Sequence, residues 1–148
     1  MNFPAHRVMA LAIASTLAFS AAVQAAAPAK AAPARAENPF LSQEDAFARS
    51  ARIANVDYVL DFTLTGKETF AGTTTVTFDL KDTASDVTLD LNKATVRSVS
   101  VNGKPVQTRY NNAFITIGAA DLAKGRNTVA VAYERVHSTN GEGLHRMV

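Results

Sequence analysis

Two histidines and one glutamate near the end of the sequence are the residues best suited to metal chemistry. His137 and His145 are eight positions apart, and Glu142 lies between them in a Gly-containing loop. Imidazole and carboxylate groups bind zinc in many proteins, but a helical zinc site of the His-Glu-x-x-His pattern is absent from this sequence. The pattern favours a turn with a solvated carboxylate, so we predict no metal ligand among these three residues.

The hydroxyl residues beside the first of these histidines, Ser138 and Thr139, are the candidate nucleophiles. A catalytic hydroxyl needs a base and a third group that orients the base, and no Gly-x-Ser-x-Gly elbow is present. The acidic residues between Asp82 and Asp90 lack the regular oxygen-rich spacing of a calcium loop. We therefore predict no catalytic, cofactor-binding or metal-binding residue in this chain.

Composition excludes several classes of protein. The 148 residues contain 15 Lys and Arg against 13 Asp and Glu, and these charges are scattered rather than clustered. A nucleic-acid-binding surface normally requires a basic cluster, so we predict no nucleic-acid partner. The sequence has no cysteine, which excludes disulfides, thiolate metal sites and thiol nucleophiles.

The first 25 residues have the pattern of a signal peptide. Arg7 precedes an apolar, small-residue-rich run over residues 8–23, and Val23-Gln24-Ala25 supplies small residues where a signal peptidase cleaves. We expect cleavage after Ala25, export to the bacterial periplasm, and no membrane association after cleavage. Residues 26–40 are rich in Ala and Pro and are expected to form a mobile linker before a domain over residues 41–148.

A short helix is expected to begin the domain. Ser42 is a good N-cap residue, and Asp45, three positions later, complements the positive end of the helix dipole. The helix should extend to about Ser50, with Phe40 or Leu41 and Phe47 attaching it to the rest of the domain.

A long β-hairpin over residues 56–80 should organise everything that follows. Apolar residues alternate with polar ones on both arms, and the turn is expected at residues 65–68, which include Gly66. Because side chains alternate between faces, Phe62 and Phe78 are both predicted to point into the core, where a charge at either position should abolish cooperative melting.

The remaining signals have a period of two residues as well. Strands are predicted over residues 87–91, 95–101, 106–110, 113–117 and 127–136, with one helical turn over residues 119–124. Asn102-Gly103 predicts a tight hairpin, and the apolar character of both faces of residues 127–136 predicts a central strand covered twice. Short strands at this spacing indicate an all-β fold, an antiparallel sheet or sandwich.

One motif near the end of the chain is specific: Tyr133 together with Ser-Thr-Asn-Gly-Glu-Gly-Leu-His-Arg at residues 138–146. Weaker motifs precede it in order, at residues 48–58, 60–64, 70–78, 89–91 and 101–103. Over roughly residues 42–148, these segments resemble the opening of M1-family zinc aminopeptidases of the aminopeptidase N type. The resemblance implies a saddle-shaped or sandwich-like antiparallel N-terminal β-domain that is incomplete at its C-terminus.

The family's catalytic motifs are missing from this chain. The zinc-binding His-Glu-x-x-His, its downstream Glu and the substrate-binding Gly-x-Met-Glu-Asn strand do not occur. The resemblance thus implies a zinc aminopeptidase that releases N-terminal residues from peptides only for a full-length parent, in which a catalytic domain is the partner of this one. Peptide substrates and zinc would belong to that parent, and whether this chain is an enzyme stays open.

Two other functions remain compatible with the sequence. The first is an autonomous secreted β-sandwich that binds a peptide, a glycan or another protein at a sheet edge, with residues 73–77 on an exposed strand face. The second is a structural or assembly module, because a β-domain without its last strands exposes a strand edge and an apolar face that favour pairing.

Overall fold

A computed structural model describes residues 34–65, 68–141 and 143–147. The predicted signal peptide, the first part of the predicted linker (residues 26–33), the centre of the hairpin turn (residues 66–67) and Glu142 lie outside the described residues. Residues 34–40 contain neither helix nor strand. The elements that follow are α1 (Gln43–Arg52), β1 (Ile53–Thr63), β2 (Thr69–Leu80), β3 (Val87–Asp90), β4 (Thr95–Val101), β5 (Lys104–Pro105), β6 (Arg109–Tyr110), β7 (Phe114–Ile117), the 3-10 helix η1 (Ala119–Asp121) and β8 (Gly125–Val136).

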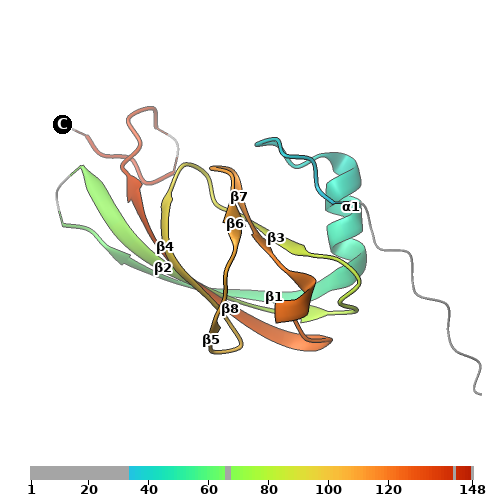
Figure 1. Cartoon of the computed structure of the whole chain (residues 1–148). Coiled ribbons are helices and arrows are strands. Elements are labelled where there is room, and N and C mark those ends of the chain that lie inside the picture. Colours follow the sequence, from blue (N-terminus) through green and yellow to red (C-terminus); the bar gives the residue numbers. More distant parts are fainter. Residues whose placement is uncertain (1–33, 66–67, 142, 148) are drawn as a thin grey trace, which may run out of the picture.

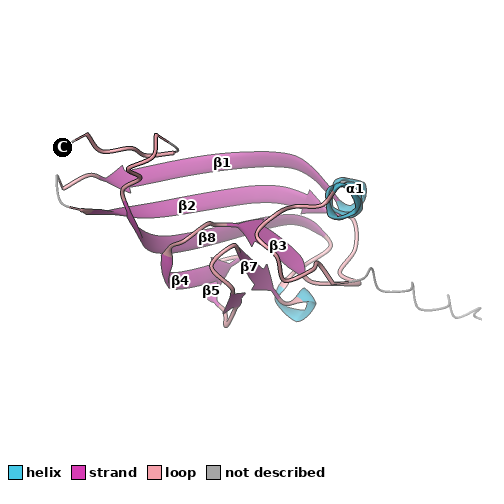
Figure 2. Cartoon of the chain, turned by 90° about the horizontal axis from the view of Figure 1, so that it is seen from above, coloured by secondary structure: helices cyan, strands magenta, loops and turns pink. Residues whose placement is uncertain are grey.

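The strands form two antiparallel sheets. A large sheet has the order β1-β2-β8-β4-β5, and a small sheet has the order β3-β7-β6. Figure 1 shows the small sheet lying across one face of the large one, with α1 beside the end of the large sheet where β1 begins. The view in Figure 2 shows β1 as the outermost long strand of the large sheet. The predicted all-β, antiparallel fold is confirmed.

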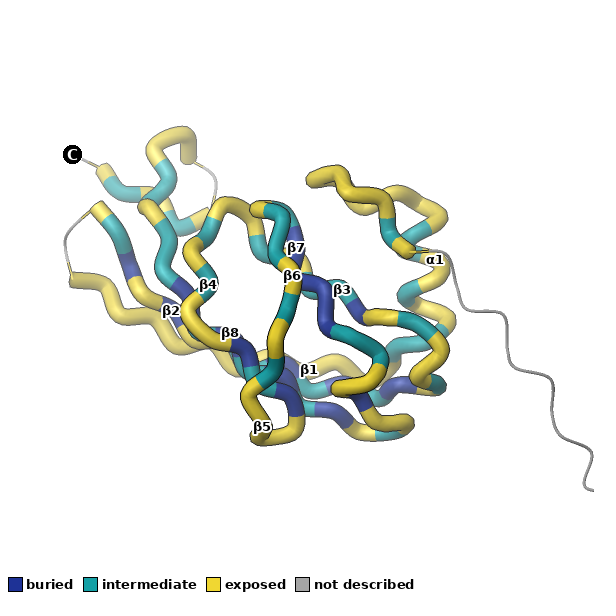
Figure 3. The backbone as a smooth tube through the Cα atoms, in the orientation of Figure 1, coloured by how far each residue is buried: buried dark blue, intermediate teal, exposed yellow. Residues whose placement is uncertain are grey.

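The hydrophobic core lies between the two sheets. On β2 and β8 the buried residues alternate with more exposed ones along most of each strand, because alternate side chains point toward the small sheet. Figure 3 shows these alternating buried positions along the strands. The largest side chains with less than 2% of their surface exposed are Phe78, Phe114, Leu80, Ile115, Ile117, Val101, Val129 and Asn127.

Asn127 is the polar member of this core, and all its hydrogen-bonding groups are used. Its amide nitrogen donates to the carbonyls of Ala123 (2.7 Å) and Gly125 (2.9 Å). Its oxygen accepts from the Ala123 amide (2.9 Å) and from the side chain of Asn102 (3.1 Å). Because a buried amide is costly unless it is paired, this network fixes the loop before β8 to the turn after β4.

The predicted hairpin is present, and one glycine of β2 makes room for an aromatic ring. Gly72 lies opposite Phe62 on β1 and opposite Tyr133 on β8. A Cβ at Gly72 would lie 2.6 Å from the Tyr133 ring, so any larger residue would push that ring out of place. The hydroxyl of Tyr133 is then 3.4 Å from that of Thr74.

The prediction that the first arm of the hairpin is buried is wrong. Tyr58, Leu60, Phe62 and Leu64 are 62%, 53%, 46% and 58% exposed. The alternation on β1 was read correctly as a strand, but the small sheet covers β2, β8 and β4 and does not extend over this edge. Phe62 makes one edge-to-face contact, with Phe70, at 5.9 Å between ring centroids.

The helix begins as predicted, but its attachment differs. Ser42 is the N-cap, and its hydroxyl accepts from the Asp45 amide at 3.0 Å. Phe40 and Phe47 are 78% and 66% exposed, and Leu41 is also exposed, so the expected hydrophobic attachment is wrong. The basic residues of the last turn, Arg49 and Arg52, hold α1 instead through ion pairs to the small sheet and to the loop before it.

The remaining predictions for turns and strands are partly confirmed and partly wrong. The Asn102-Gly103 hairpin is confirmed, with both residues at positive φ (51° and 79°). The single strand predicted over residues 106–110 is instead two short strands in different sheets, β5 before it and β6 within it. β8 is central as predicted, but among the described residues only one of its faces is fully buried, so the prediction that it is covered twice is wrong.

The difference between the two arms of the hairpin gives a test. Phe78→Ala should lower the free energy of unfolding by about 3–5 kcal/mol, because it opens a cavity in a closed core. Phe62→Ala should cost about 1 kcal/mol or less, because that ring is half-exposed and loses mainly its contact with Phe70. Urea denaturation of both variants measures the difference, and equal losses would contradict the placement of β1 at an uncovered edge.

Candidate functional site

The C-terminal loop directs its two histidines to different neighbours. The ring of His137 packs on Phe70, with centroids 5.1 Å apart. His145 instead accepts, through Nδ1, a 3.3 Å hydrogen bond from the amide of Gly141. The loop is closed by a parallel bridge between Ser138 and His145, so its hydrogen bonds stabilise a turn.

The candidate nucleophiles of this loop are also used in turn structure. The hydroxyl of Ser138 hydrogen-bonds the side chain of Asn140, and the Asn140 amide donates back to it at 3.3 Å. Thr139 is exposed to solvent. Neither hydroxyl is shown with a histidine partner in the described part of the loop, so the geometry provides no activated nucleophile.

The acidic residues between Asp82 and Asp90 are engaged by arginines and backbone amides. Asp82 accepts from the Ala84 amide at 3.1 Å and from Arg52 Nε at 3.2 Å. These bonds hold the pKa of the Asp82 carboxyl below its usual value, chiefly through the Ala84 amide. Asp86 accepts from the Ala119 amide at 3.0 Å. Oxygens used in this way are directed at fixed donors rather than at a common point where a calcium ion would bind.

Asp90 is the centre of an ion-pair cluster that sequence reasoning did not identify. One carboxylate oxygen accepts from Arg35 at 2.5 Å and the other accepts from Arg49 at 2.8 Å. Arg35 comes from the segment before the helix, and its guanidinium also lies 4.1 Å above the ring of Phe114. The side chain of Arg35 is only 6% exposed, whereas that of Asp90 is 48% exposed. We call Asp90, Arg35 and Arg49 the Asp90 cluster.

The protonation of Asp90 reflects two opposed effects. Partial burial raises the pKa of its carboxyl, but hydrogen bonds from Arg49 and Arg35, together with their charges, outweigh burial and hold the pKa below its usual value. The carboxylate is therefore ionised at neutral pH. It joins the N-terminal segment and α1 to β3.

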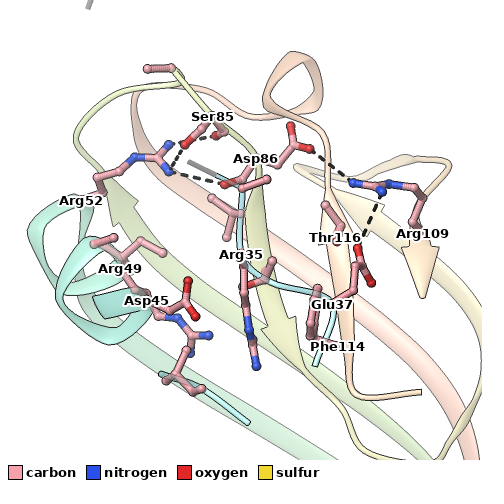
Figure 4. Close-up of a pocket in the computed structure, with 17 residues that line it drawn as sticks. Arg35, Glu37, Asp45, Arg49, Arg52, Ser85, Asp86, Arg109, Phe114 and Thr116 are labelled. Carbon is pink, nitrogen blue, oxygen red and sulfur yellow. Dashed lines mark hydrogen bonds and ion pairs between the residues drawn. The ribbon is translucent and has the colours of Figure 1, made fainter. Parts of the chain in front are cut away.

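The cluster borders a cavity of about 370 Å³ between α1, residues 34–41 and the small sheet. Figure 4 shows Arg52 directed at Ser85 on one side, and Arg109 between Glu37 and Asp86 on the other. Arg35 Nε and Nη2 and Arg49 Nη2 have no hydrogen-bond partner among the described residues, but these nitrogens are also inaccessible to solvent. These buried nitrogens of Arg35 and Arg49 are thus closed to a ligand, whereas the side chain of Arg109, which also lines the cavity, is 73% exposed and pairs with Glu37 and Asp86.

Residues 73–77, considered above as part of a binding surface, lie on β2, which is an interior strand between β1 and β8. A peptide cannot add to the sheet there, because both sides of β2 are already paired. The edge strands are β1 and β5 of the large sheet and β3 and β6 of the small sheet.

No group of three or more histidine, cysteine, aspartate or glutamate side chains able to hold a metal ion occurs among residues 34–65, 68–141 and 143–147. Over the same ranges, no helix has the length and apolar character that crossing a membrane requires.

We compared the chain with known proteins. No protein-family model matches the chain. Aminopeptidase N from Streptomyces lividans is 32% identical over 111 residues, which are 73% of this chain and 13% of that protein. The chain resembles an aminopeptidase N. The resemblance inferred from the ordered motifs is confirmed, and it concerns a small part of a much longer protein.

Solved structures agree on the fold. Legionella pneumophila aminopeptidase A, crystallised with aspartic acid, matches with a TM-score of 0.52 and 15% identity, over 65% of this chain and 13% of that one. The M1 zinc metallopeptidase from Deinococcus radiodurans matches with a TM-score of 0.46 and 19% identity, over 57% of this chain and 21% of that one. The match with a TM-score above 0.5 thus shows a similar fold within the Legionella aminopeptidase A structure.

The Asp90 cluster makes a testable contribution to stability. Asp90→Asn should cost about 1–2 kcal/mol at pH 7, a value that discounts the half-exposed carboxylate for solvent screening but includes the loss of the partner of buried Arg35. Because the folded-state pKa is below the ordinary value of an aspartate carboxyl, this contribution is present above that ordinary value and is lost as the pH falls through the lowered folded-state pKa.

Glu134→Gln is the matched control, since Glu134 pairs with Arg97 at 2.6 Å on an open surface, with side chains 38% and 61% exposed. Thermal melting of both variants between pH 2 and pH 7 distinguishes them. The Asp90 variant should lie well below the wild type at pH 7 and approach it in acid. A larger loss for the Glu134 variant would contradict the assignment.

Proposed function

We propose that this chain is a non-catalytic β-domain portion of an exported zinc aminopeptidase that releases N-terminal residues from peptides. The observation that carries the proposal is the 32% identity over 111 residues to aminopeptidase N of Streptomyces lividans. The chain spans 13% of the length of that relative, so catalysis, zinc binding and substrate recognition are assigned to residues outside this sequence.

The geometry of the described residues supports a non-catalytic role for this domain. Among the described residues, Ser138, His145 and Asp82 are held in turns or ion pairs, His137 packs on Phe70, and Thr139 is exposed to solvent. The two sheets form a closed core that needs no ligand, which is what a supporting domain requires. A catalytic domain carrying a His-Glu-x-x-His helix would be the natural partner of such a domain in a longer protein.

Activity of the purified chain tests this proposal. We expect no release of the chromophore from aminoacyl-anilides in the presence of added zinc, because the residues that would activate a zinc-bound water are absent from the sequence. Hydrolysis that disappears on addition of a chelator would overturn the proposal. A His-Glu-x-x-His motif encoded in frame after the codon for Val148 would support it independently.

Export is the second part of the proposal, and it rests on the sequence of the first 25 residues. A signal peptidase should cut after Ala25, so that chain recovered from a bacterial periplasm begins at Ala26. Mass spectrometry of the N-terminal peptide measures this directly. Ala25→Leu should block cleavage at this position, because signal peptidases require a small residue there, and the same variant should accumulate uncut. Normal processing of that variant, or an intact N-terminus in the wild type, would contradict the assignment.

A further inference from the structure

The loop after β8 is closed around one Asn-Gly dipeptide, residues 140–141. The Ser138 amide donates to the Leu144 carbonyl at 3.0 Å, and the Arg146 amide donates to the Ser138 carbonyl at 3.1 Å. The side chain of Leu144 packs against the hydrophobic core. These contacts fix His145 opposite Ser138 in the parallel bridge, with the dipeptide in the loop between them. Figure 1 shows this loop beyond the end of β8, near the C-terminus.

The main-chain nitrogen of Gly141 is paired with a base. Its N–H donates to Nδ1 of His145 at 3.3 Å, and both residues are exposed to solvent. An imidazole nitrogen that accepts a hydrogen bond carries a free electron pair, and the proton of that neutral ring is then on Nε2. Imidazole is the commonest general base in proteins. The nucleophile that this loop can activate is therefore a main-chain nitrogen and not a hydroxyl.

The side-chain carbonyl of Asn140 is polarised by a donor. The hydroxyl of Ser138 donates to Oδ1 of Asn140, and the main-chain amide of Asn140 donates to the Ser138 oxygen at 3.3 Å. A donor on a carbonyl oxygen stabilises the negative charge that this oxygen gains when the carbon is attacked. Because Gly141 directly follows Asn140, attack of its nitrogen on the side-chain carbon closes a small cyclic imide, a succinimide.

We propose that residues 140–141 are a site of self-modification, at which Asn140 is converted into aspartate and isoaspartate through this succinimide. The Gly141 nitrogen forms a bond to Cγ of Asn140 while His145 accepts the proton from that nitrogen. The bond from Cγ to Nδ2 then breaks, and Nδ2 takes the proton from His145 and leaves as ammonia. Water finally opens the succinimide at either of its two carbonyls, which gives the two products. The reaction needs only water, which reaches these exposed residues.

The backbone at Gly141 is suited to this attack. Its φ is +84°, a conformation that residues with a side chain rarely adopt. Apart from its two chain neighbours, no atom of the described residues lies within 4 Å of where a Cβ of residue 141 would stand. The nitrogen is therefore not shielded from that side.

The other Asn-Gly dipeptide of the sequence, residues 102–103, is held in the opposite way. The side-chain oxygen of Asn102 accepts from the Thr128 amide at 2.9 Å, and its nitrogen donates to buried Asn127 at 3.1 Å. Attack on this amide would break both bonds and remove a partner from a buried polar group, which is costly. The chain thus contains its own control. The inference concerns the covalent structure of this loop and does not depend on the peptidase assignment.

Peptide mapping of the purified full chain, incubated at pH 7, tests the proposal. Trypsin releases residues 136–146 and residues 98–109, each with a single asparagine. We expect the peptide 136–146 to be replaced over time by an aspartyl and an isoaspartyl product, which chromatography separates and mass spectrometry identifies. The peptide 98–109 should stay unchanged. An aspartyl product alone would mean direct hydrolysis by water and would overturn the proposal, as would equal conversion of both peptides or no conversion.

Substitutions of His145 test its role as the base. His145→Gln keeps a hydrogen-bond acceptor but not a base, and it should slow the conversion by at least about tenfold, as His145→Ala should. Free imidazole in the buffer should restore part of the rate in the alanine variant. His137→Gln is the matched control, because the ring of His137 packs on Phe70 instead. Unchanged rates in both His145 variants, or an equal loss in the His137 variant, would show that His145 is not the base.

The hydroxyl of Ser138 is tested by a conservative pair of variants. Ser138→Ala removes the donor to Oδ1 of Asn140 and should slow the conversion several-fold. Ser138→Thr keeps a hydroxyl and should convert at nearly the rate of the wild type. Asn102 should stay intact in both variants, which shows that its contacts with β8 persist. Equal rates for the alanine variant and the wild type would contradict the role of this hydroxyl.

Discussion

The pairing of β2 with β8 is the interaction on which the rest of the structure depends. These two strands pair over their full length, from Thr69 opposite Val136 to Leu80 opposite Gly125, and their shared buried face supplies one wall of the core. β1 attaches to the outer side of β2, and β4 attaches to the other side of β8. The small sheet packs on the same face. Each of these additions presupposes that the β2–β8 pair is correctly in register.

Local signals in the sequence predicted the helix, strands and turns well. They did not predict which strand faces are covered by another part of the fold. The N-cap at Ser42 and the turn at Asn102-Gly103 depend on neighbouring residues, and both were predicted correctly. The alternation on β1 showed that one face of the strand is apolar, but the same pattern is compatible with burial or exposure. Whether anything lies over Phe62 depends on the extent of the small sheet, which strand patterns alone do not determine.

The charged and titratable residues of the candidate site show the same limit of prediction from sequence. The Asp90 cluster joins residues that are 55 and 41 positions apart in the sequence, so no spacing rule could have identified it. His137 and His145 looked related because they are near each other in sequence, yet the fold gives each a separate local task. The order of short motifs was the more informative signal, since it revealed the resemblance to aminopeptidase N without any catalytic residue being present.

The position of β8 in the large sheet has a consequence for how the chain folds. The last strand in the sequence is the central one in space, so the ladder cannot form before residue 136 has been synthesised. The β1–β2 hairpin must wait for a partner strand that begins at Gly125, well after β2 ends at Leu80. Sheets dominated by such distant pairings fold in roughly milliseconds to seconds, which is the slow end of the range of folding times for single domains. The small sheet, by contrast, has all three of its strands before β8 in the sequence, so its partners are available earlier than those of the large sheet.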